Sequence, residues 1–158
     1  MCMKWSKIKP YVISVLIPLG VGVLSGFLTR DGIQAFALVE KPPLTPPAPL
    51  FPIVWSILYI LMGIGAAMVF QTDHPKRPTA LTVYAVQLIV NFFWSLFFFN
   101  LQQYAFSFFW LLLLWLLIVV MIRLFYQIKP IAGLLQLPYL LWVTFAGYLT
   151  FGVWMLNR

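Results

Sequence analysis

The sequence predicts an all-α integral membrane protein, built as a bundle of five transmembrane helices with a Pro-rich lid loop between the first two. Hydrophobic residues make up 63% of the chain and charged residues only 8%, whereas a soluble domain carries about 25% charged residues. Five apolar stretches reach the roughly 20 residues that cross the hydrocarbon core of a bilayer. Because these stretches use most of the chain, we expect a single membrane domain over residues 1–158.

The first expected span covers about residues 11–29 and follows a cluster of lysines at residues 4–9. Its apolar stretch is longer than the ~7–15 residues of a signal peptide, so we expect the protein to retain it. Gly22 and Gly26 have the GxxxG spacing that allows two helices to approach closely. This close packing is expected either within one bundle or between two copies.

A long loop is expected at residues 30–51, and five of the residues in its segment 41–49 are prolines. Each proline fixes φ and lacks a backbone donor, so this segment should be extended and stiff. Composition leaves two interpretations open, a rigid connector or a lid over one end of the bundle.

Four further spans are expected, separated by short polar breaks, at about residues 52–71, 79–101, 105–126 and 133–156. Pro52 falls in the first turn of its helix, where a missing N–H is tolerated. Pro138 lies inside the last span, so we expect it to kink that helix.

The ten cations of the chain lie mainly in the expected loops. If the N-terminus is cytoplasmic, the outside segments carry only Arg30, Lys41 and Arg158. The other seven cations then lie inside, in agreement with the positive-inside rule. We interpret the cations as orientation signals that also favour anionic lipid headgroups, and we expect no nucleic-acid partner.

The sequence contains few residues that could support acid–base catalysis or bind a metal ion. The acids Asp31, Glu40 and Asp73 and the single histidine, His74, fall in expected loops with no nucleophile arranged around them. No carboxylate lies within a span, so transport coupled to an ion gradient is disfavoured. Cys2 is the only cysteine, which excludes an intrachain disulfide. We expect neither a metal site nor an obligatory cofactor.

The tryptophans are more informative. Trp94, Trp115 and Trp142 fall near the middle of their spans, where an interfacial aromatic belt does not explain them. An indole N–H in hydrocarbon needs a partner. Two interpretations stay open: these rings pack between helices, or some of them line a cavity that holds a flat aromatic ligand.

An amide stripe on the third span supports a cavity. Gln87, Asn91 and Ser95 recur every fourth residue and therefore share one face, which should point into the bundle. The stripe is expected either to join helices by hydrogen bonds or to contact a ligand. Small and large side chains also share one face in the second and fifth spans, which leaves room for a planar guest. These residues are Trp55, Tyr59, Met62 and Ala66, and Pro138, Trp142, Ala146 and Leu149.

Four groups of motifs are distributed over nearly the whole chain. They are Lys41-Pro42-Pro43 with Pro46-Pro47, Pro52-Ile53-Val54-Trp55 with Leu58-Tyr59 and Met62-Gly63, Gln87, Asn91, Trp94 and Ser95, and Tyr139 through Trp142 with Ala146, Tyr148 and Leu149. Taken together, these motifs resemble those of the TspO/MBR family, the tryptophan-rich sensory or translocator proteins, also called peripheral benzodiazepine receptors.

The resemblance implies a receptor or sensor that forms a homodimer in the bacterial cell membrane. It would bind porphyrins, including haem, isoquinoline or benzodiazepine-type ligands, and sterols, in a pocket under the first loop. Passive carriage of tetrapyrroles or sterols is the alternative function. The resemblance also implies light-dependent porphyrin degradation, with the indoles of Trp55 and Trp142 as the photochemical groups. The expected ligand-binding residues are Trp55, Tyr59, Asn91, Trp94, Trp142, Ala146 and Leu149, with Pro42, Pro43, Pro46 and Pro47 in the lid.

Two positions in the loop depart from the family pattern. Leu44 stands where the family commonly has tryptophan, and Ala48-Pro49-Leu50 lacks the usual aromatic residue. We therefore expect the lid end of the pocket to be less aromatic than in other members.

Overall fold

A computed structural model describes residues 4–158, so Cys2 lies outside the described part of the chain. Five helices within this part are long and apolar enough to cross a membrane, which confirms the predicted all-α fold with five spans. They are α1 (Trp5–Leu28), α3 (Leu50–Phe70), α4 (Arg77–Ser95) with its π-helical continuation η1 (Leu96–Asn100), α5 (Tyr104–Ile128), and α7 (Leu137–Leu156) preceded by the short α6 (Pro130–Leu134).

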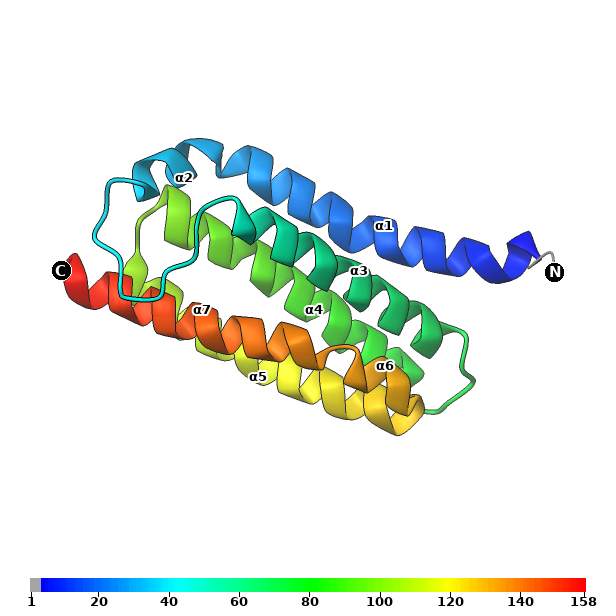
Figure 1. Cartoon of the computed structure of the whole chain (residues 1–158). Helices are drawn as coiled ribbons and strands as arrows, with labels where there is room; N and C mark the ends of the chain where they lie inside the picture. Colours follow the sequence, from blue (N-terminus) through cyan, green and yellow to red (C-terminus); the bar gives the residue numbers. More distant parts are fainter. Residues whose placement is uncertain (1–3) are drawn as a thin grey trace.

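The helices run roughly parallel or antiparallel in one bundle (Figure 1). Helix α1 packs along α3, α4 packs along α5, and α5 packs along α7. The described chain starts and ends at opposite ends of the bundle, as an odd number of spans requires. The loop between α2 (Arg30–Phe36) and α3 crosses the end where the C-terminus lies, while α6 lies at the other end (Figure 1).

The distribution of polar and apolar side chains is that of a protein in lipid. Leu16, Val23 and Leu141 are more than half exposed on the outer surface of the spans. Gln87 and Gln136, by contrast, are fully buried between helices. Because lipid solvates apolar side chains and cannot satisfy amides, this arrangement is favourable only inside a bilayer.

Three local expectations were wrong. Residues 30–36, expected in a loop, form α2, because Asp31 occupies its first turn and Gly32 packs against the backbone of Phe99. Helix α1 begins at Trp5 and not near residue 11, with Pro10 inside it. The last span is interrupted, not kinked: α6 ends at Leu134 and α7 begins at Leu137.

The interruption has a clear physical cause. Pro138 occupies the first turn of α7, where its missing N–H costs no hydrogen bond. Gln136, in the turn between the two helices, donates from Nε2 to the carbonyl oxygens of Leu61 at 3.1 Å and Ala132 at 3.3 Å. The Gln136 side chain therefore attaches the turn between α6 and α7 to α3. Gly65 of α3 has no side chain, which leaves room for the Gln136 amide.

Glycines allow α1 and α3 to approach closely. A Cβ atom added at Gly63 would collide with the backbone of Val15, and one added at Gly22 would lie 2.5 Å from the ring of Tyr59. A Cβ atom at Gly26 would meet nothing within 4 Å. Of the GxxxG pair, Gly22 therefore packs within one chain, whereas Gly26 leaves space beside α1.

We predict that Gly63→Ala destabilises the bundle by about 1–3 kcal/mol, the usual cost of overpacking a closely packed interface. Gly20→Ala is the matched control, because its new methyl group would meet nothing within 4 Å. Thermal unfolding in detergent should give a lower midpoint for Gly63→Ala and an unchanged or slightly higher midpoint for Gly20→Ala. Equal midpoints for the two variants would contradict the close approach.

Candidate ligand-binding cavity

A cavity of about 480 Å³ lies at the loop end of the bundle. Its walls come from α1, α2, α3, α4 with η1, and α7, and the loop supplies Lys41, Thr45, Pro46 and Ala48. The volume falls within the roughly 300–1,000 Å³ of typical small-molecule sites, and the lining is mainly apolar and aromatic.

The loop forms the roof of this cavity and is anchored to α7. Asn157 accepts from the backbone N–H of Glu40 at 3.1 Å and donates to its carbonyl oxygen at 2.8 Å. The Tyr148 hydroxyl donates to the carbonyl oxygen of Pro43 at 2.8 Å. Pro42 packs directly on Gly152, where a Cβ atom would lie 2.6 Å from the proline ring. The Pro-rich segment is therefore a lid as well as a connector.

Aromatic side chains form the opposing walls. On α3, Trp55 stacks on Tyr59 with ring centroids 5.5 Å apart. On α7, Trp142 meets Phe51 of α3 edge-on at 5.8 Å. Trp94 of α4 stacks on Phe98 of η1 at 5.2 Å. Ala146 and Leu149 complete the α7 wall, so the lining combines large rings with smaller side chains.

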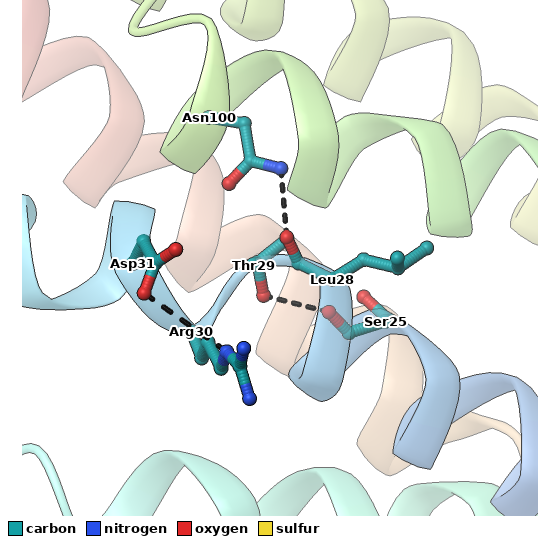
Figure 2. Close-up of polar contacts among 6 residues, drawn as sticks. All are labelled: Ser25, Leu28, Thr29, Arg30, Asp31 and Asn100. Carbon is teal, nitrogen blue, oxygen red and sulfur yellow. Dashed lines mark hydrogen bonds and ion pairs between the residues drawn. The ribbon is translucent and has the colours of Figure 1, made fainter.

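The junction between α1 and α2 forms another wall and is held by polar contacts (Figure 2). Thr29 donates from its hydroxyl to the Ser25 carbonyl oxygen at 2.7 Å, which closes the end of α1. Asn100, at the end of η1, donates to the carbonyl oxygen of Leu28 at 2.9 Å. The π-helical turn η1, a form often found at functional sites, thus holds the junction while Phe98 and Phe99 face the cavity.

The structure separates the expected ligand-binding residues into two groups. Those that line the cavity are Trp55, Tyr59, Trp94, Trp142, Ala146, Leu149 and Pro46. Those that do not line it are Asn91, Pro42, Pro43 and Pro47. Pro42 and Pro43 instead contact α7, as described above.

Asn91 belongs to a buried hydrogen-bond network next to the cavity. The Tyr139 hydroxyl donates to Gln87 Oε1 at 2.8 Å and accepts from Asn91 Nδ2 at 3.1 Å. Gln87 Nε2 lies 3.9 Å from the Met62 sulfur. Two members of the amide stripe therefore join α4 to α7, and only Ser95, one turn further along, reaches the cavity.

The mid-span tryptophans divide in the same way. Trp94 and Trp142 line the cavity, whereas Trp115 Nε1 donates to the Thr144 hydroxyl at 2.9 Å and joins α5 to α7. The Trp94 Nε1 atom is buried and has no hydrogen-bond acceptor among the described residues. Trp115 therefore packs between helices, whereas Trp94 and Trp142 line a cavity, and the expectation that this cavity holds a flat ligand stays a prediction.

A second, apolar groove of about 380 Å³ lies between α3 and α7. Trp142 lines this groove as well as the main cavity, and it is the one residue that the two linings share. Its indole therefore stands between the two spaces.

Sequence reasoning missed several lining residues. Phe51, Phe98 and Phe99 add aromatic surface, and Phe36 and Ile33 reach the cavity because α2 is helical. Runs of phenylalanine carry no periodic signal in an apolar span, and α2 was expected to be a loop. Their positions depend on tertiary packing.

Comparison with known proteins gives consistent matches over most of the chain. The sequence model of the TspO/MBR family matches residues 14–155. Protein CrtK of Rhodobacter capsulatus is 42% identical over 121 residues, covering 75% of this chain and 76% of that protein. The tryptophan-rich sensory protein of Cereibacter sphaeroides is 32% identical over 157 residues, covering 99% and 95%. The translocator protein of Bos taurus is 32% identical over 153 residues, covering 94% and 90%.

We predict that Tyr139→Phe destabilises the bundle by about 1–3 kcal/mol, because it leaves two buried amides without their partner. Tyr126→Phe is the control, since Tyr126 is 52% exposed and its hydroxyl makes no hydrogen bond within the described residues. The measurement is thermal unfolding in detergent. If both substitutions shift the midpoint equally, the Tyr139 network does not hold the helices together.

Proposed function

The chain belongs to the TspO/MBR family, as its motifs predicted, and we propose that it is a membrane receptor that binds porphyrins in the roofed cavity. Membership of this family supports a sensor- or receptor-type role in the membrane. The proposal extends that role to a ligand class, tetrapyrroles such as protoporphyrin and haem, together with smaller flat molecules of the isoquinoline or benzodiazepine type.

The single observation that carries the proposal is the position of Trp55 and Trp142 on two walls of one cavity. Indole rings stack on planar aromatic systems, and burial of a large apolar ring is strongly favourable. Around them the lining is apolar except for a few hydroxyl groups, one indole N–H and one lysine. Such a surface supports recognition by shape and stacking more than by a set of hydrogen bonds.

We further propose that the protein acts as a homodimer with a cytoplasmic N-terminus. The excess of cations at residues 4–9, 76–77 and 129 supports this orientation. The roof and the cavity would then lie on the outer side of the membrane. Support for a dimer comes only from the resemblance to the family.

The test is porphyrin binding followed by the absorbance of the porphyrin itself, which does not depend on the number of indoles left in each variant. We expect Trp142→Phe and Trp55→Phe each to weaken protoporphyrin binding about tenfold, or about 1.4 kcal/mol, because a smaller ring stacks less well. Trp115→Phe is the matched control, since Trp115 binds Thr144 away from the cavity. Equal affinities for all four proteins would remove the cavity as the binding site.

The same two indoles support a second activity, light-dependent degradation of the bound porphyrin. A porphyrin excited beside an indole can react through oxygen chemistry without an acid or a base, and no carboxylate lines the cavity. We expect the double variant Trp55→Phe/Trp142→Phe, saturated with porphyrin and illuminated, to lose porphyrin absorbance several times more slowly than Trp115→Phe. Equal rates would show that these indoles are not the reacting groups.

A further inference from the structure

Among the described residues, Lys41 is the one cationic residue that lines the cavity, and no carboxylate of this part of the chain lines it. Its ammonium group lies 4.9 Å from the centroid of the Phe36 ring. It donates to the carbonyl oxygens of Ala37 at 3.1 Å and Val39 at 3.0 Å. Because Phe36 and Ala37 also line the cavity, these contacts hold the positive charge at the edge of the cavity, where the loop meets α2.

This charge has no acidic partner within the described residues. The ion pair there is Arg30 with Asp31 at 4.0 Å, and the neighbouring Glu40 approaches no cation within that distance. An ammonium group has three N–H donors. Carbonyl oxygens take two of them, so one donor and a full positive charge remain. The two carbonyl bonds alone would suit a lysine that caps α2, but they do not explain the free donor at a cavity wall.

Three of the hydroxyl groups that line the cavity already donate to the backbone. Thr29, Thr45 and Thr150 each donate at 2.7 Å to a backbone carbonyl oxygen, those of Ser25, Pro42 and Ala146. Their oxygens are left as acceptors only. Because Lys41 is the only charged group in the lining among the described residues, it is the strongest donor that an anion entering the cavity would meet.

We propose that Lys41 binds a carboxylate of the ligand, so that the cavity selects flat apolar ring systems bearing an acidic group over neutral rings of the same shape. This assignment rests on the proposed receptor function and specifies its ligand class. The apolar body lies between Trp55 and Trp142, and the carboxylate lies at the α2 end, beneath the roof. A neutral sterol offers no group of this kind to Lys41.

The experiment compares protoporphyrin with its dimethyl ester, which keeps the ring and removes the negative charges. Both are titrated in neutral detergent into wild type, Lys41→Gln and Lys41→Arg. The control is Lys76→Gln, because Lys76 lies at the far end of α4 and donates to Gln127 at 2.7 Å. We expect Lys41→Gln to weaken binding of the acid about tenfold, the usual scale for losing a charge-assisted hydrogen bond. Binding of the ester should stay within about twofold on the same scale.

Lys41→Arg should keep most of the preference for the acid, and Lys76→Gln should match wild type. Retained binding of the ester also shows that each variant is folded. Equal losses for acid and ester, or no loss for either, would overturn the role of Lys41 while the receptor function stands. If wild type binds neither compound, the receptor function itself fails, and the assignment of Lys41 fails with it.

Discussion

The side chain of Tyr139 connects three helices beside the cavity, and the arrangement of the walls depends on it. Its hydroxyl joins α7 to two amides of α4, and its ring meets Trp55 of α3 edge-on with centroids 6.2 Å apart. Water is absent at this depth, so each amide must find its partner within the protein. The backbones of α3 and α7 rarely approach each other closely within the described helices, and aromatic side chains span the distance, Tyr139 to Trp55 and Trp142 to Phe51. Tyr139 thus helps to position α7 beside α3, with Trp55 and Trp142 in the lining of one cavity.

The loop covers the end of the bundle where the backbones of α3 and α7 stay apart. The loop is attached to α7 through Asn157, Tyr148 and Gly152, and its other end continues into α3. On the opposite side, Asn100 donates to the carbonyl oxygen of Leu28 at the end of α1, and Gly32 allows α2 to pack against η1. The cavity thus lies between the loop with α7 on one side and the α1–α2 junction with η1 on the other.

Much of this arrangement could be predicted from the sequence. The five spans were predicted because a bilayer demands long apolar segments, which leave a strong signal. The face of α4 that carries Gln87, Asn91 and Ser95 was also predicted. Helical periodicity predicts which residues share a face, but it does not predict what that face contacts. The contact of Asn91 with Tyr139 and the position of Ser95 in the cavity lining could therefore not be predicted. Helix α2 and the break at Gln136 depend on contacts with Phe99 and Leu61, and these contacts leave no local pattern.

Of the loop positions that depart from the family pattern, Ala48 lines the cavity. Leu44 is 80% exposed, has a positive φ of 70°, and does not line the cavity. The leucine at this position therefore does not affect how aromatic the lining is. Phe51 supplies an aromatic ring near the roof, next to Trp142. The lid end is thus aromatic from α3 and cationic from Lys41. If the cavity binds the proposed ligands, ring shape and charge are the two ligand properties that we expect it to discriminate, because the lining is mainly apolar and its three threonine hydroxyls already donate to the backbone.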